Sequence, residues 1–241
     1  KRRIGKPGSK VLKAACIGTG GIYSVHMGYL QSFDNVEIVA LCDINEELLK
    51  RSQERFGATG FTDFNEMLAE TELDAVWICT PPTVRREPLL ACADRGIPVF
   101  CEKPAEHDPH VAREIAAELK QRNARVQVGY CCRTMPIVDR LKEQMADDII
   151  HLIQSFYGCN SSLAMQMPSW FYDKELSGGG LEDQATHNFD LLRMLVGEVK
   201  QVKGIASNPV KAKQAGYTID EVIGLALLFE KGTMCTHAHS W

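Results

Sequence analysis

The sequence predicts an α/β protein in which a doubly wound parallel sheet is followed by an α+β domain with a mostly antiparallel, open sheet. In the first half of the chain, short apolar runs alternate with helical patterns, which is typical of parallel strands covered on both faces. The second half is rich in strand patterns and has one clear helical pattern. The 241 residues suffice for two domains, which we predict to span 11–130 and 131–241.

In the first domain each apolar run leads into a helical pattern. The predicted strands cover residues 11–18, 36–43, 73–80, 97–104 and 125–130. The predicted helices cover residues 21–32, 44–57, 63–70, 83–96 and 108–123. Gly57 closes the second helix, whereas Asp63 and Asp108 are typical N-caps of the third and the last.

The second domain is predicted to be strand-rich. Strand patterns cover residues 149–160, 199–207, 221–230 and 233–241, and a helix pattern runs from about 181 to 196. Lys231-Gly232 is typical of a hairpin tip. Because the sequence ends at Trp241 within a strand pattern, we expect this domain to be truncated.

Composition excludes several classes of protein. A net charge of −4 argues against a general nucleic-acid binder, and no apolar run is long enough for a membrane span. The nine cysteines include no CxxC pair, so we expect no disulfide framework, no metal site and a cytoplasmic location. The pair Cys131-Cys132 is expected to be two ordinary free thiols rather than a redox-active pair.

A glycine-rich turn follows the first strand. Gly18 allows a tight turn, and Gly20, Gly21 and Ile22 open the first helix, whose N-terminal amides and dipole favour a pyrophosphate. The third glycine of the GxGxxG pattern is replaced by Tyr23, which we expect to alter how the pyrophosphate sits. With the strand and helix around it, the turn predicts a dinucleotide-binding Rossmann domain.

Asp43 closes the second strand, where an acidic side chain binds the ribose hydroxyls of NAD. Its carboxylate would repel the 2′-phosphate of NADP, and Ile44 and Asn45 offer that phosphate no cation. The sequence therefore favours NAD(H) over NADP(H).

Two further strand ends carry polar motifs. Thr80 and Pro81 begin a rigid loop that either forms a wall for the nicotinamide or is a simple strand-to-helix turn. Glu102-Lys103 follows the next apolar run, and ligands of open α/β sheets lie at such carboxyl ends. Lys103 can donate to a substrate hydroxyl or carbonyl; the alternative is a surface ion pair.

The later helix carries Asp183, His187 and Asp190 at a spacing that places them on one face. Three glycines at 178–180 precede this helix, and we expect them to leave its N-terminus open to a ligand. The alternative is a solvated polar face with a chance histidine.

Together, the segments IGTGGIYSVH, Asp43, TPP, VFCEKP, GYCCR and GGGLEDQATHNFD resemble the glucose–fructose oxidoreductase / inositol dehydrogenase / rhizopine catabolism (Gfo/Idh/MocA) family. The resemblance covers about residues 11–241. It implies an NAD(P)-dependent oxidoreductase acting on CH–OH groups of sugars, inositols or related molecules, and a homodimer or homotetramer formed through the second sheet.

The resemblance also implies roles for individual residues. Lys103, Asp183 and His187 correspond to the catalytic residues, and Asp183 and His187 also contact substrate. Glu102 lies beside the nicotinamide, with Lys103. Arg133 and Trp170 are expected to contact substrate. Arg85 stands where many members have histidine, so no cofactor role is transferred to it.

Three functions remain open from the sequence. In the first, His187 removes the hydroxyl proton as general base, Lys103 stabilises the alkoxide and Asp183 orients them, in an NAD-dependent oxidoreductase. The second is a non-catalytic dinucleotide-binding regulator with the same fold. The third is an NAD-using glycosidase, which would release a free sugar without accumulating NADH.

Overall fold

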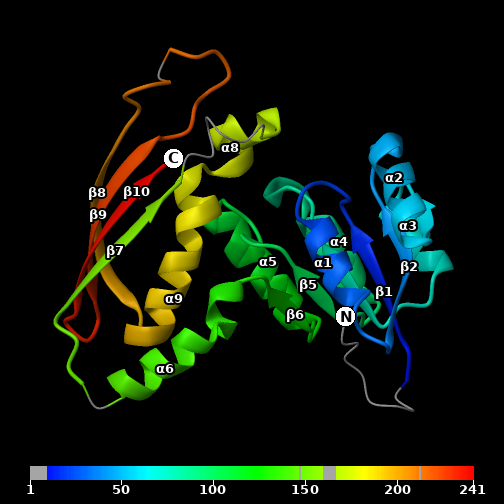
Figure 1. The fold of residues 1–241 in the computed structure, drawn as a ribbon, viewed down its shortest axis with the longest axis horizontal. Coiled ribbons are helices and arrows are strands. Elements are labelled where there is room, and N and C mark those ends of the chain that lie inside the picture. The colour runs from blue at the N-terminus through cyan, green and yellow to red at the C-terminus, as the bar shows by residue number, and fades with distance from the viewer. Residues whose placement is uncertain (1–9, 147, 160–166, 212) are drawn as a thin grey trace. The chain divides into compact units, whose positions relative to one another are not determined.

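The computed structural model describes residues 10–146, 148–159, 167–211 and 213–241. The chain divides into two compact units, Lys1–Gly129 and Tyr130–Trp241, each with its own sheet (Figure 1). Among the described residues, no helix has the length and apolar content needed to cross a bilayer.

The first unit contains a six-stranded sheet in the order β3-β2-β1-β4-β5-β6, and every pair of neighbours is parallel. The strands are β1 (Leu12–Ile17), β2 (Val36–Cys42), β3 (Thr59–Phe61), β4 (Ala75–Ile78), β5 (Val99–Cys101) and β6 (Val126–Val128). The order reverses direction between β1 and β4, and this switch point is where ligands of doubly wound sheets bind.

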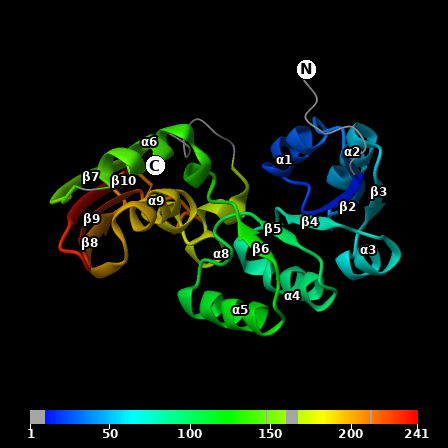
Figure 2. The same ribbon diagram turned by 90° about the horizontal axis from the view of Figure 1, so that it is seen from below.

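Helices cover both faces of this sheet, as predicted. They are α1 (Tyr23–Leu30), α2 (Glu46–Phe56), α3 (Phe64–Glu70), α4 (Arg86–Asp94) and α5 (Pro109–Gln121). Figure 2 shows α1 and α2 on one side of the strands and α3, α4 and α5 on the other. The buried side chains form two clusters accordingly: Ala15 and Ile17 of β1 pack with one cluster, and Cys16 between them packs with the other.

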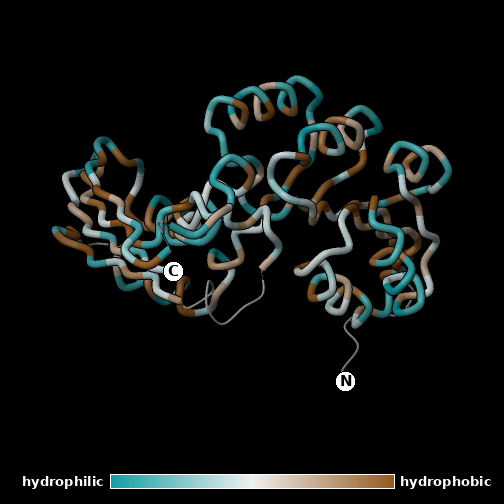
Figure 3. The backbone as a smooth tube through the Cα atoms, turned by 90° about the horizontal axis from the view of Figure 1, so that it is seen from above, coloured by the Kyte–Doolittle hydropathy of each residue, from teal (hydrophilic) through white to brown (hydrophobic). Residues whose placement is uncertain are grey.

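Local signals position these helices. The side chain of Asn45 accepts hydrogen bonds from Glu47 and Leu48 at the start of α2, and Gly57 ends that helix in the left-handed conformation. The side chains of Asp63 and Asp108 cap α3 and α5 as predicted. Figure 3 shows hydrophilic and hydrophobic residues alternating along the helical turns, as expected for helices with one buried face.

Two features of the first unit differ from the prediction. The strand β3 was not predicted, because its three residues pair with β2 but carry no alternating pattern of their own. The helix predicted over 83–96 is shorter: a 3₁₀ helix, η1 (Pro82–Val84), precedes α4, which begins at Arg86. This late start places Pro88 in the first turn, where no backbone N–H is needed for the helix.

The second unit contains a four-stranded sheet in the order β7-β10-β9-β8. The strands are β7 (Leu152–Gly158), β8 (Val199–Ser207), β9 (Val222–Phe229) and β10 (Met234–Ser240). Only the β7–β10 pair is parallel, so the sheet is mixed and mostly antiparallel. Gly232 forms the turn between β9 and β10 with a φ of +90°, as the hairpin prediction requires. Of the strand predicted over 149–160, Asn160 lies outside the described residues.

The prediction of a single helix in this unit was wrong. The structure has α6 (Pro136–Met145), α8 (Lys174–Ser177) and α9 (Thr186–Val196), with 3₁₀ helices η2 (Cys131–Thr134) and η3 (Ser169–Tyr172). A π-helical segment, Leu181–Ala185, leads directly into α9. The sequence does carry a pattern that indicates α6, since Pro136 is its first residue and its apolar residues share one face.

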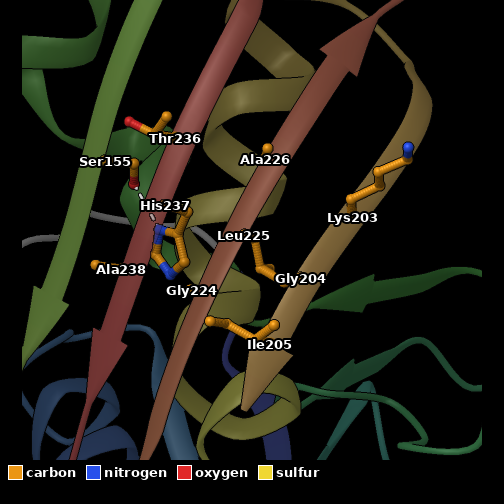
Figure 4. A pocket seen from close by; sticks show the side chains of 10 residues that line it. All are labelled: Ser155, Lys203, Gly204, Ile205, Gly224, Leu225, Ala226, Thr236, His237 and Ala238. Carbon is orange, nitrogen blue, oxygen red and sulfur yellow. Dashed lines mark hydrogen bonds between the residues drawn. The ribbon is translucent and has the colours of Figure 1, made fainter.

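Among the described residues, one face of the second sheet is covered by helix and the other is open. Leu192 and Val196 of α9 pack against Leu227, Phe229 and Cys235 of the sheet. On the open face the exposed apolar side chains are Leu152 (60%), Phe156 (71%), Ile205 (82%), Val222 (41%) and Met234 (49%). A pocket of about 550 Å³ lies across β8, β9 and β10, beside Ile205. Figure 4 shows the side chains that line it.

Candidate active site

The glycine-rich turn lies against the loop that follows β4. Gly18 has a φ of +91°, and a Cβ added to it would lie 2.8 Å from the backbone nitrogen of Thr80. Neither the conformation nor the space admits a side chain, so glycine is required here. The turn after β1 and the loop after β4 therefore meet at the switch point of the sheet.

Asp43 is held by the same turn. Its Oδ2 accepts hydrogen bonds from the backbone nitrogen of Thr19 (2.6 Å) and from the Thr19 hydroxyl (2.9 Å). Its Oδ1 accepts one from the backbone nitrogen of Asn45 (2.8 Å). A carboxylate has about four acceptor positions, so these three bonds fix its orientation and leave room for one hydroxyl donor.

The remainder of the turn suits a pyrophosphate. Gly20 and Gly21 are exposed, and a Cβ built on either would meet no atom within 4 Å in the part of the chain that the structure describes. The first turn of α1, which starts after Ile22, carries no acidic side chain that would repel an anion. The backbone of this turn is therefore accessible and its electrostatics fit the phosphates of a dinucleotide.

Tyr23 does not occupy the turn. Its side chain is buried, its hydroxyl lies 2.6 Å from the Ser52 hydroxyl, and its ring packs edge-on against Phe56. The expectation that Tyr23 alters the pyrophosphate site is therefore corrected: the core between α1 and α2 takes up its large side chain.

The next polar group lies at the carboxyl end of β5. Glu102 is buried, and its Oε1 lies 2.6 Å from Nε2 of His26, while its Oε2 accepts the backbone N–H of Lys103 (2.9 Å). Burial acts to raise the pKa of Glu102, but these hydrogen bonds outweigh it and the pKa lies below its usual value. Glu102 is thus an anion fixed beside the half-buried Lys103.

Arg85 joins the loops after β4 and β5, a role that sequence reasoning missed. It is 5% exposed, and its guanidinium donates to the backbone carbonyls of Thr80 (2.8 Å), Glu102 (2.6 Å) and Pro104. No sequence signal separates it from its neighbour Arg86, which forms partly exposed ion pairs on the surface.

In the second unit, the glycines at 178–180 serve packing rather than ligand access. Gly178 ends α8, and a Cβ on Gly180 would lie 2.5 Å from Nε2 of the buried His239. Gly179 and Gly180 are buried. The expectation that these glycines leave the helix N-terminus open to a ligand is therefore corrected: Gly180 lets the chain approach β10 closely, and Gly179 packs against Ile219.

Asp183 and His187 lie about one turn apart on the continuous segment formed by the π-helix and α9. Asp183 accepts a hydrogen bond from Nε2 of Gln184 (2.8 Å), and Gln184 in turn accepts one from the hydroxyl of Tyr157 (3.1 Å). The imidazole of His187 contacts the ring of Tyr130 edge-on, with centroids 6.2 Å apart. Both candidate catalytic side chains are half-buried, and π-helical turns are frequent at functional sites.

The other predicted residues of this unit have partners within it. Arg133 forms a two-fold ion pair with the buried Asp190, with both N–O distances at 2.6 Å. Asp190 is therefore not part of a solvated polar face. Trp170 is half-buried and packs against Phe171 in an aromatic cluster with Trp241.

His187 belongs to a cluster of potential metal ligands that was not expected from the sequence. The thiols of Cys131 and Cys132 and the imidazole of His187 place their ligand atoms within 4.8 Å of one another. Burial and the neighbouring Cys131 thiol raise the pKa of Cys132, so this thiol is protonated at neutral pH and a poor nucleophile.

The structure thus groups Gly18, Asp43, Thr80 and Glu102 with Lys103 at the carboxyl edge of the first sheet. Asp183 and His187 lie in the second unit, Tyr130–Trp241. Each unit carries its own part of the predicted site.

Known proteins resemble both units. The oxidoreductase family with an NAD-binding Rossmann fold, GFO_IDH_MocA, matches residues 12–130, and the GFO/IDH/MocA C-terminal domain matches residues 141–241. The uncharacterized oxidoreductase YrbE of Bacillus subtilis is 28% identical over 234 residues, covering 94% of this chain and 66% of its own length. The myo-inositol 2-dehydrogenase of Thermotoga maritima is 27% identical over 191 residues, covering 78% of this chain and 55% of its own length.

A solved structure shares the fold. The WlbA dehydrogenase from Bordetella pertussis, in complex with NADH and UDP-GlcNAcA, superposes with a TM-score of 0.83 at 24% identity, covering 95% of this chain and 66% of that one. The chain therefore spans about half to two thirds of the length of these curated relatives. Because the two family domains together match most of its residues, the chain belongs to the Gfo/Idh/MocA family of oxidoreductases.

Proposed function

We propose that the protein is an NAD(H)-dependent oxidoreductase that interconverts a hydroxyl and a carbonyl on a sugar, an inositol or a related small molecule. The observation that carries this proposal is the edge of the first sheet, where the Gly18 turn packs on Thr80 and orients Asp43. The family match and the relatives named above support it.

The cofactor would be held by residues of the first unit. The backbone at Gly20, Gly21 and Ile22 would bind the pyrophosphate, and the remaining acceptor position of Asp43 would take a ribose hydroxyl. The negative charge of Asp43 disfavours a 2′-phosphate, which supports NAD(H) over NADP(H). Thr80, Pro81, Glu102 and Lys103 would border the nicotinamide. When bound, the nicotinamide ring supplies hydride transfer.

Three side chains would act on the substrate hydroxyl. His187 takes its proton as general base, because a neutral imidazole accepts a proton near pH 7. Lys103, held beside the buried anion Glu102, stabilises the developing alkoxide by its charge. Asp183, whose carboxylate is oriented by Gln184, fixes the substrate and the histidine. This mechanism requires Lys103 and His187 to meet at one substrate hydroxyl.

The relatives support the proposed substrate class. One relative is named for myo-inositol, and the WlbA structure holds a nucleotide sugar acid. We propose Arg133 and Trp170 as further substrate contacts, with the ion pair to Asp190 holding the Arg133 guanidinium in one orientation.

We further propose a homodimer or homotetramer formed through the open face of the second sheet, and a cytoplasmic location. The exposed apolar residues on that face support the first proposal, since contiguous apolar surface marks interaction sites. The nine free cysteines support the second.

Turnover of Lys103→Ala tests the catalytic proposal. Assayed with a panel of inositols and sugars, the variant is expected to lose about 10²–10⁴-fold in kcat while its NADH affinity stays within about twofold. Lys120→Ala, an exposed lysine in α5, is the matched control and should retain both.

Other results of this assay would assign a different role to Lys103 or a different function to the protein. Loss of turnover and NADH affinity together would make Lys103 a structural residue. NADH binding without turnover of any substrate would favour the regulator, and release of free sugar without NADH accumulation would favour the NAD-using glycosidase.

A further inference from the structure

The cluster of Cys131, Cys132 and His187 has the composition of a soft-metal site. Its three candidate ligand atoms lie within 4.8 Å of one another. Two thiolates and an imidazole around one Zn²⁺ stand about 3.5 Å apart, given metal–sulfur and metal–nitrogen distances of about 2.3 and 2.0 Å. Side-chain rotations that close the group by about 1 Å would complete such a site.

The backbone around the cluster holds the ligands in place. At one end of the segment 130–133, the hydroxyl of Tyr130 lies 3.2 Å from Oγ1 of Thr186. At the other end, Arg133 forms its two-fold ion pair with Asp190. These two contacts fix η2 along the first turn of α9, on either side of the cysteines and His187. Ligands that are already oriented lose less entropy when a metal binds.

The cluster is also accessible. Cys131 is exposed, and Cys132 and His187 are half-buried, so the cluster opens to solvent at Cys131. Three protein ligands leave the fourth tetrahedral position to water. Soft thiolate ligands select Zn²⁺ and its heavier congener Cd²⁺ over hard cations such as Mg²⁺.

We propose that Cys131, Cys132 and His187 bind one Zn²⁺ or Cd²⁺ ion, and that the ion inhibits the enzyme by occupying His187. Binding releases the two thiol protons to solvent and forms two metal–sulfur bonds and one metal–nitrogen bond, with no change in oxidation state. A metal-bound imidazole nitrogen cannot take a substrate proton. The inhibitory part of the proposal rests on the proposed function, whereas the binding part does not.

Titration of the metal-free chain with Cd²⁺, in the presence of a phosphine reductant, tests the binding part. The thiolate-to-cadmium charge-transfer absorption should saturate at one equivalent per chain. Cys131→Ser and Cys132→Ser should each weaken binding by more than about 100-fold, and His187→Gln by at least about tenfold. Cys159→Ser, which removes another half-buried thiol of the same unit, should bind Cd²⁺ as the unchanged chain does.

Zinc-edge X-ray absorption provides a second test that needs no variant. It should show two sulfur ligands at about 2.3 Å and one nitrogen at about 2.0 Å. A charge-transfer band that persists in both cysteine variants, that is lost in Cys159→Ser, or that never saturates would overturn the site.

Activity assays test whether the bound metal inhibits the enzyme, independently of the binding measurements. Zn²⁺ should inhibit the unchanged chain reversibly, and should inhibit Cys131→Ser and Cys132→Ser at least about tenfold less, each measured against its own metal-free rate. Stoichiometric binding without inhibition would overturn the inhibitory part and the role of His187 as base. Failure to find any oxidoreductase activity would leave the cadmium result unaffected, so the two failures are distinguishable.

Discussion

At the scale of single residues, the candidate cofactor edge depends on Arg85, a buried cation that donates to backbone carbonyls. Arg85 donates to the backbone carbonyls of Thr80, Glu102 and Pro104, and thereby ties the loops after β4 and β5 together. Its loss would leave three carbonyls in a buried region without this donor, and unsatisfied buried acceptors are costly.

Replacing Arg85 with alanine should therefore lower the free energy of unfolding by about 3 kcal/mol. The adjacent Arg86→Ala removes only partly exposed ion pairs and should lower the free energy of unfolding much less. Urea denaturation of the two variants measures the difference. Equal losses in stability would contradict the clamping role.

The sequence predicted the positions of some site residues but not of others, because only some of them depend on local signals. The positions of Gly18, Asp43 and Lys103 follow from their place after strands, which is a local signal. The pairing of Arg133 with Asp190 joins residues 57 positions apart, and such contacts depend on packing that no local pattern encodes. The same holds for Arg85.

At the scale of elements, β10 carries two buried histidines beneath the glycine segment. His239 is fully buried, stacks on Tyr157 and lies against Gly180. Burial, and to a smaller extent the neighbouring His237, lowers the pKa of His239 to about 4. Burial also lowers the pKa of His237.

These shifts predict an acid-sensitive second unit. Below the unfolded-state pKa of about 6.5, the unfolded chain binds protons that the folded chain does not, so stability falls as the pH falls from about 6.5 to about 4. The pKa shift of His239 should lower the free energy of unfolding by on the order of 2–3 kcal/mol over this pH range. Unfolding free energies measured across this range should decline, and His239→Gln should flatten the decline; an unchanged slope in the variant would contradict the assignment.

Elements with strong periodic patterns were predictable, and those stabilised by pairing were not. The apolar runs of β1 and β2 and the capping residues of α2 and α5 can be recognised from the sequence alone. The three residues of β3 become a strand because β2 offers a free edge. The π-helical start of α9 was not foreseen, since no residue pattern distinguishes it from an α-helix.

At the scale of the whole molecule, the open face of the second sheet predicts self-association. Phe156 and Ile205 are 71% and 82% exposed on this face. A charge introduced there would have to be buried in a subunit interface, so Phe156→Asp should shift the protein towards monomer. Ile137→Asp, at an exposed apolar position of α6, is the control and should leave the mass unchanged.

Sedimentation analysis measures this shift. A monomeric unchanged chain, or equal masses for the unchanged chain and Phe156→Asp, would contradict the interface. The division into a doubly wound first unit and a mostly antiparallel second unit was itself predictable, because the two halves differ in their hydrophobic patterns throughout.

We propose above all that the first unit binds NADH through its glycine turn and Asp43. Calorimetric titration of the chain with NADH and, separately, with NADPH tests it most directly, together with Gly20→Ala. A methyl group at Gly20 would meet no atom of the described residues within 4 Å, so this variant should keep its thermal stability but lose at least about tenfold in NADH affinity.

We expect one NADH per chain, with NADPH bound at least about tenfold more weakly. If neither dinucleotide bound to the folded chain, or if Gly20→Ala bound NADH as tightly as the unchanged chain, the proposed cofactor site would be contradicted.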